Sequence, residues 1–241
     1  MGGSAEGEGF NGKNNQEVIT PSLTLESDLR ATKPFQMKQA FFILICFFCV
    51  SASGQENQAE FDGRKWEAPY FLDTLKGWGI ERFLIPIGFA PSIPYKGVED
   101  IRFAPGWSKK ESGEYWSYAF LWYLEGLQRL DPGIVERNLV AYYTGLANVN
   151  VDKAKVTVDK LVTIKASIKE SGPGTQTFEG TVDILDYMTL KPISLNVSVR
   201  IKYCKEQDRT FVFHELSPQP YSDKVWGRLN YLWATLRCTK E

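Results

Sequence analysis

Residues 115–124 have the sequence YWSYAFLWYL, and they are the strongest candidate for a β-strand in the chain. Alternate residues of a strand point to opposite faces of its sheet, and here the set that starts at Tyr115 and the set that starts at Trp116 are both largely apolar. A strand that is apolar on both faces needs a packing layer on each face. The stretch therefore predicts a central strand that is covered on both sides.

Two amphipathic helices are available as these covers. The first is predicted over 132–147, because Asp131 is a suitable N-cap, Pro132 suits the first helical position, and apolar residues recur at helical spacing. The second is predicted over 223–237, where a wide apolar stripe follows a cap at Ser222 or Asp223. The residues of that stripe are Val225, Trp226, Leu229, Leu232, Trp233 and Leu236.

Short alternating segments separated by turns make up most of the remaining chain. They are 81–87, 100–104, 156–168, 178–185, 193–203 and 210–215. Short strands joined by turns are typical of antiparallel hairpins. The predicted fold class is therefore α+β: a mostly antiparallel twisted sheet with two amphipathic helices packed on it.

An apolar run that does not begin at the N-terminus predicts the domain limits. Residues 37–39 form a short basic start, residues 40–50 are apolar, and residues 51–54 are small, as in a secretory signal peptide. Eleven residues rise about 16 Å as a helix, roughly half of a bilayer's hydrocarbon core, so contact with the membrane is expected to be transient. The protein is then exported to the periplasm or the extracellular space. The alternative is a membrane anchor through residues 40–50.

The other limits follow from this segment. Residues 1–36 are polar and have no apolar face, so we expect a disordered stretch, or a spurious extension if translation begins at Met37. Residues 55–80 are predicted to form an N-terminal arm, and 81–241 a single α+β domain.

Of the 28 basic and 29 acidic residues, four and five precede residue 55, so the remaining charges cancel. Such a surface gives no electrostatic basis for binding nucleic acid.

Two cysteines, Cys204 and Cys238, lie beyond the signal segment. In an oxidising compartment they are expected to form a disulfide, whose loop closure contributes about 3–4 kcal/mol; two buried free thiols are the alternative.

Catalytic signatures are few. His214 is the only histidine, which excludes a multi-histidine metal site within one chain, and no G-x-S-x-G motif occurs. A base at His214 with the neighbouring carboxylate of Glu215 is a catalytic candidate; the alternative is a histidine bonded to backbone or water. The carboxylate pairs Glu99/Asp100 and Asp183/Asp186 could serve acid–base or calcium roles, but we expect them to be solvated turn charges. We predict no metal and no cofactor.

Aromatic residues gather between residues 107 and 123. Such rings can stack on sugars, line a cavity for an apolar ligand, or form plain core. The candidate ligand-binding residues are Trp107, Trp116, Tyr118 and Trp122.

The segments Gly97–Trp107 and Tyr115–Trp122 resemble a stretch shared by small uncharacterised exported bacterial proteins, which carry a domain of unknown function. The resemblance covers about residues 80–147 and implies a bacterial, secreted setting without an assigned activity. The expected function is therefore non-catalytic: a binding or interaction domain of the bacterial envelope for an apolar or sugar ligand or a protein partner. The alternative is a secreted hydrolase that uses His214 with a nearby carboxylate.

Overall fold

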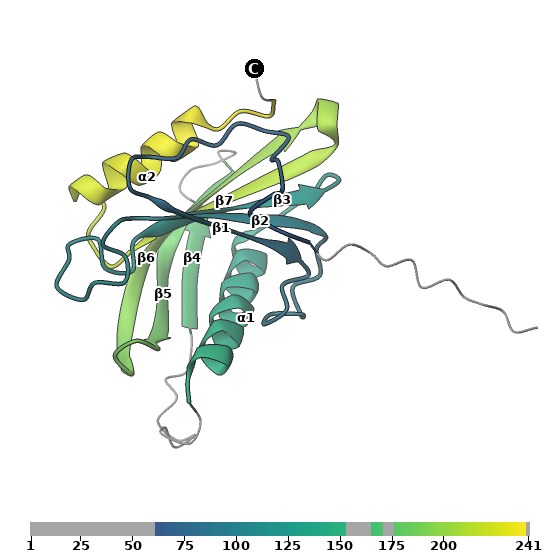
Figure 1. The fold of residues 1–241 in the computed structure, drawn as a ribbon. Helices are drawn as coiled ribbons and strands as arrows, with labels where there is room; N and C mark the ends of the chain where they lie inside the picture. Colours follow the sequence, from purple (N-terminus) through teal and green to yellow (C-terminus); the bar gives the residue numbers. More distant parts are fainter. Residues whose placement is uncertain (1–60, 153–164, 171–175, 240–241) are drawn as a thin grey trace, which may run out of the picture. The chain divides into compact units, whose positions relative to one another are not determined.

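The computed structural model describes residues 61–152, 165–170 and 176–239, which all belong to the compact unit Gln55–Glu241 (Figure 1). The predicted signal peptide 37–54, the extension 1–36 and the first residues of the predicted arm lie outside this part. So do residues 156–164 of one predicted strand and the turn that follows it. No helix among the described residues is both long enough and apolar enough to cross a membrane.

Seven strands form one antiparallel sheet in the order β1-β2-β3-β7-β6-β5-β4. Their bounds are β1 Gly79–Ile85, β2 Gly97–Phe103, β3 Tyr118–Glu125, β4 Lys165–Glu170, β5 Thr177–Asp186, β6 Lys191–Cys204 and β7 Arg209–Ser217. Within the described ranges the helices are α1 Pro132–Asn150 and α2 Lys224–Thr235, and a 3-10 turn, η2, spans Lys205–Gln207. The predicted fold class, α+β with a mostly antiparallel sheet and two helices, is confirmed.

Strand β3 lies inside the sheet between β2 and β7, and seven of its eight residues are buried. Its even-numbered side chains, such as Phe120 and Trp122, belong to a core that includes residues of α1. Its odd-numbered side chains, such as Ala119 and Leu121, belong to a second core that includes residues of α2. Figure 1 shows the two helices on opposite sides of the sheet, as the two apolar faces of this strand predict.

The start of β3 differs from the sequence prediction. The strand begins at Tyr118 and not at Tyr115, because Trp116 adopts a left-handed backbone conformation (φ 52°) and its N–H donates to the carbonyl of Trp107 (2.8 Å). Positive φ is uncommon for a bulky residue and breaks the alternation of a strand. As a result Tyr115 joins Trp116 and Tyr118 in the core on the α1 side.

The segment before β1 packs on the α2 side of the sheet. Tyr70, Leu72 and Trp78 are buried there, and Phe71 forms an isolated bridge with Arg237. The guanidinium of Arg102, on β2, donates to the carbonyls of Leu72 (3.3 Å) and Asp73 (3.1 Å) and so fixes the segment.

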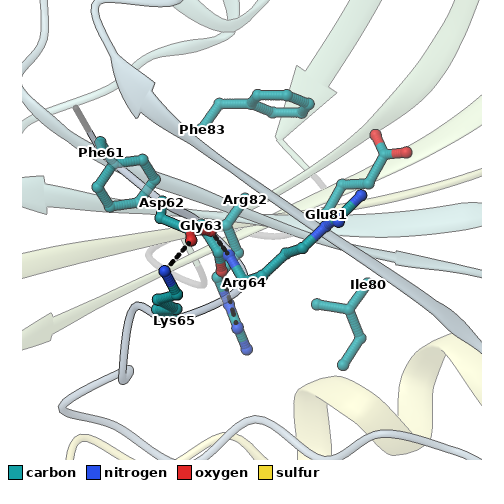
Figure 2. Close-up of a pocket in the computed structure, with 9 residues that line it drawn as sticks. All are labelled: Phe61, Asp62, Gly63, Arg64, Lys65, Ile80, Glu81, Arg82 and Phe83. Carbon is teal, nitrogen blue, oxygen red and sulfur yellow. Dashed lines mark hydrogen bonds and ion pairs between the residues drawn. The ribbon is translucent and has the colours of Figure 1, made fainter.

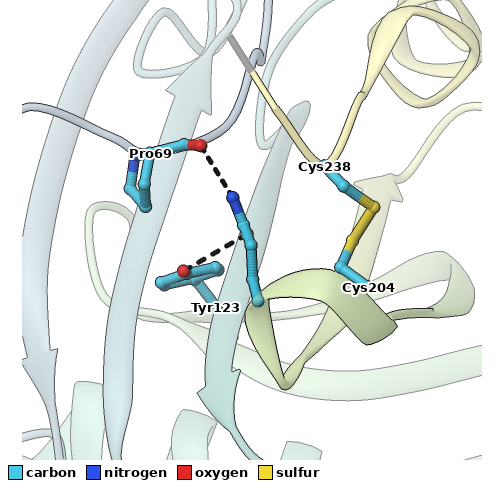
Figure 3. The surroundings of a disulfide bond; sticks show 5 residues. Pro69, Tyr123, Cys204 and Cys238 are labelled. Carbon is cyan, nitrogen blue, oxygen red and sulfur yellow. Dashed lines mark hydrogen bonds between the residues drawn. A yellow bond between two sulfur atoms is a disulfide. The ribbon is translucent and has the colours of Figure 1, made fainter.

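A disulfide joins Cys204, at the end of β6, to Cys238, just beyond α2 (Figure 3). The predicted pairing is therefore present. Close to it, the side-chain amide of Gln207 donates to the carbonyl of Pro69 (3.0 Å). The bond thus ties the C-terminal end of α2 to the sheet beside the segment that precedes β1.

Candidate ligand-binding cavity

A cavity of about 330 Å³ lies between α1 and the sheet. Eight of its thirteen lining residues are aromatic. The sheet and the β2–β3 connection contribute Phe83, Phe103, Trp107, Trp116 and Tyr118, while Phe89, Tyr142 and Tyr187 come from other elements. Aliphatic side chains from β2 and α1 complete the apolar wall.

The rings form a continuous wall. The ring centroid of Phe103 lies 4.5 Å from that of Trp107 and 5.7 Å from that of Tyr118. Trp116 continues the series toward Tyr187, whose ring it meets edge to face at 5.2 Å. Spacings of this kind are those of favourable aromatic pairs, so the wall is a packed unit that offers ring surface to the cavity.

The cavity has an exposed rim and a closed floor. At the rim, Val149 and Phe83 are 63% and 39% exposed, Glu81 is exposed, and Trp107 is half-buried. At the floor, Trp116, Tyr118 and Tyr142 are buried. The cavity therefore opens to solvent at its rim and ends on buried aromatic side chains.

A completely buried carboxylate, Glu99 of β2, lies behind the floor. It accepts one hydrogen bond from the Tyr142 hydroxyl at Oε1 and another from the Trp122 indole N–H at Oε2, both at 2.8 Å. Burial raises the pKa of Glu99 to about 7, although these two donors favour the charged form. The carboxylate also holds the ring of Tyr142 in a fixed orientation against the cavity.

The phenols of the floor are neutral. Burial raises the pKa of Tyr118, Tyr142 and Tyr143 well above the ordinary value, and the hydroxyls of Tyr118 and Tyr143 hydrogen-bond to each other. Because these hydroxyls are already paired, they offer a ligand few free hydrogen-bonding groups.

Three of the four predicted ligand-binding residues, Trp107, Trp116 and Tyr118, line the cavity together. The fourth, Trp122, does not line it and instead donates to Glu99 behind the floor. Sequence reasoning missed Glu99 and Tyr142 as site residues. The available signals were a phenol, Tyr142, at apolar spacing in the predicted helix 132–147, and a carboxylate next to the apolar Val98 and one residue before the predicted strand 100–104.

His214 and Glu215 are not brought together. His214 faces the α1 side, where its ring stacks on Phe120 with centroids 4.1 Å apart, and burial lowers its pKa to about 3. Glu215 is the next residue of β7 and faces the other side, 3.4 Å from Arg200. Burial raises the pKa of Glu215 to about 7. Strand alternation thus separates the base and the carboxylate of the catalytic candidate, and neither lines the cavity.

A larger depression of about 960 Å³ borders the edge strand β1 (Figure 2). It is lined by 61–65 and 80–83, and two of its charged groups pair with each other: Lys65 Nζ lies 3.3 Å from Asp62 Oδ2. Figure 2 shows the carboxylate of Glu81 pointing away from this pair. The depression brings few side chains toward a common point, so the aromatic cavity is the better candidate site.

The described ranges contain no group of three or more His, Cys, Asp or Glu side chains placed to hold a metal ion. The side chains at the cavity offer aromatic rings, paired phenols and the carboxylate of Glu81, with the carboxyl group of Glu99 behind the floor. Comparisons of the chain with family models, with curated proteins and with solved structures found no match.

Proposed function

We propose that this protein is a non-catalytic binding protein whose cavity between α1 and the sheet takes a small, largely apolar molecule. The observation that carries the proposal is the convergence of Trp107, Trp116 and Tyr118 on one cavity of about 330 Å³ with an exposed rim. Ligand sites of proteins typically occupy about 300–1,000 Å³ and are lined mainly by apolar and aromatic side chains.

The polar groups of the cavity favour an apolar ligand over a sugar. A sugar carries hydroxyl groups around its whole ring, and each one that is buried without a partner weakens binding. Besides phenols and the indole N–H groups of Trp107 and Trp116, the lining offers only Glu81 and Asn150 as polar side chains, and the phenols of Tyr118 and Tyr142 are already paired. An exported, bacterial-envelope setting is part of the proposal and rests on the signal-peptide pattern of residues 37–54 and on the sequence resemblance.

A neutral fluorescent probe tests the proposal. N-phenyl-1-naphthylamine is titrated into the full-length protein, and both probe emission and tryptophan quenching are followed. We expect saturable binding that Leu146→Trp weakens at least tenfold, because Leu146 lines the cavity and the larger ring fills it. Leu127→Trp is the matched control, since Leu127 is exposed and does not line the cavity. Equal affinity of the two variants, with unchanged circular dichroism, would overturn the proposal.

A further inference from the structure

The cavity carries negative charge without a compensating cation. Among its described lining residues the only charged side chain is Glu81, and none is lysine, arginine or histidine. The carboxyl group of Glu99 lies just behind the ring of Tyr142, but burial raises its pKa to about 7, so it is only partly charged at neutral pH and Glu81 is the main negative charge. Burial is the main cause of the raised pKa of Tyr187, and the charges of Asp186 and then Glu81 add to it, so the field of Glu81 reaches the lining. An anionic ligand would therefore be repelled.

The aromatic wall favours the opposite charge. The face of an aromatic ring is electrically negative, and a cation over it within about 6 Å of the centroid is attracted. Phe103, Trp107 and Tyr118 place three adjacent rings along one wall. The phenols of Tyr118 and Tyr142 are neutral, so their rings keep this negative face and add no charge of their own.

Elsewhere in the molecule, aromatic rings already have cations of their own. In the described part of the chain five arginines lie over rings, those of Trp66, Phe71, Trp78, Tyr123 and Trp233. None of these five rings lines the cavity. The rings of the cavity thus form an aromatic, acidic-rimmed surface to which the described chain supplies no cation.

We propose that the cavity selects ligands that carry a cationic ammonium group, with the group held against the rings of Phe103, Trp107 and Tyr118 and with Glu81 as its counter-charge. This inference rests on the proposed ligand-binding function and specifies the class of ligand. A quaternary or tertiary ammonium joined to an apolar body matches both the charge of the rim and the apolar wall.

Two isosteric probes separate charge from shape. Phenyltrimethylammonium and tert-butylbenzene have nearly the same shape and differ by one positive charge. Both are titrated into the full-length protein, with affinity measured by calorimetry or tryptophan quenching. We expect the cation to bind at least tenfold more tightly than the neutral probe.

The variant Glu81→Gln tests whether the carboxylate of Glu81 causes the preference for the cationic probe. It should reduce affinity for phenyltrimethylammonium three- to tenfold and leave affinity for tert-butylbenzene unchanged. Glu206→Gln is the control, because it removes one exposed carboxylate from the η2 turn, away from the cavity. If Glu81→Gln and Glu206→Gln change the affinity for phenyltrimethylammonium equally, Glu81 is not the counter-charge.

The remaining outcomes distinguish a failure of the cation preference from a failure of the proposed ligand-binding function. If both probes bind with equal affinity, or the neutral probe binds better, the preference for a cation is wrong and the apolar binding function stands. If neither probe binds, and N-phenyl-1-naphthylamine also fails to bind, the proposed function itself is wrong.

Discussion

Glu99 and Asp100 are consecutive residues of β2, and both are completely buried, on opposite faces of one sheet. On the α1 side, Glu99 accepts a hydrogen bond from Tyr142 of the helix (2.8 Å). On the α2 side, Asp100 accepts one from Tyr70 of the segment before β1 (3.0 Å). Each carboxylate therefore joins the sheet to the layer that covers it, and two predictions depend on this arrangement.

The first prediction concerns the pH dependence of stability. Burial raises the pKa of Glu99 to about 7 in the folded protein, against 4.5 for an unperturbed group. Between these values the folded state holds a proton that the unfolded state has released, so this group lowers the free energy of unfolding as pH rises from 4.5 to 7. The full effect is about 3 kcal/mol, at ~1.4 kcal/mol for each pH unit.

Glu99→Gln removes this titration. Glutamine cannot accept both hydrogen bonds, so a constant penalty is expected, but the variant should gain stability relative to wild type across the same pH interval. Urea unfolding at a series of pH values measures the difference. The exposed Glu206→Gln variant should give a difference that does not change with pH. If the difference in unfolding free energy between Glu99→Gln and wild type is also independent of pH, Glu99 does not titrate as expected.

The second prediction concerns Asp100. Its carboxylate pairs with Arg102, which is 2% exposed, and with Arg82, whose Nε lies 3.1 Å from Oδ1. Asp100→Asn removes the negative charge and leaves a buried guanidinium uncompensated, which costs about 3–5 kcal/mol of unfolding free energy. Because Arg102 also holds the segment before β1, trypsin should cleave faster at Lys76.

Asp183→Asn is the matched control for this variant, because Asp183 is an exposed carboxylate on β5. It should change neither the urea midpoint nor the rate of cleavage. If Asp100→Asn behaves like this control, the buried ion pairs do not hold the segment in place.

The third prediction compares one glycine in each helix. A Cβ at Gly145 of α1 would lie 1.9 Å from the carbonyl oxygen of Phe89, so alanine there must push the helix away from a residue that lines the cavity. A Cβ at Gly227 of α2 would meet nothing within 4 Å. Both substitutions gain the same helix propensity, up to ~1 kcal/mol, and differ only in this contact.

We therefore expect Gly227→Ala to stabilise the protein and Gly145→Ala to destabilise it by about 1–3 kcal/mol through overpacking. Gly145→Ala should also weaken binding of the neutral probe. Thermal and urea unfolding measure the first effect, and probe fluorescence the second. Similar stabilisation by both substitutions would mean that α1 can move freely away from Phe89.

The fourth prediction concerns the disulfide. Replacing both Cys204 and Cys238 by alanine removes a bond between residues 34 apart in sequence. The free energy of unfolding should fall by about 3–4 kcal/mol, because the unfolded chain is no longer constrained by the closed loop. Urea unfolding of this variant is compared with that of the wild type in the presence and absence of reductant. The prediction is wrong if the double variant has the same free energy of unfolding as the wild type and reductant does not change that of the wild type.

Elements that depend on local pattern were predicted closely. The helix predicted over 132–147 is observed over Pro132–Asn150, and the one predicted over 223–237 over Lys224–Thr235. Asp131 and Asp223 cap them, each by accepting a hydrogen bond from a backbone N–H of the first turn. Apolar periodicity and capping are properties of neighbouring residues, so they can be read without knowledge of distant contacts.

The candidate site was predicted only in part. Aromatic density indicated Trp107, Trp116 and Tyr118, but that density could not distinguish the rings that line a cavity from Trp122, which does not. Glu99 belonged to a pair expected to be solvated turn charges. It is buried because Tyr142, 43 residues later in the chain, supplies a hydrogen-bond donor.

By itself the amino-acid sequence determined a central strand apolar on both faces, two capped amphipathic helices and two cysteines available to pair. Only the tertiary structure decided that His214 and Glu215 are both buried, that Trp116 turns the chain before β3, and that rings from distant elements enclose one cavity. The reason is physical: periodicity and caps act over a few residues, whereas burial of a charge or the shape of a cavity depends on groups that only folding brings together.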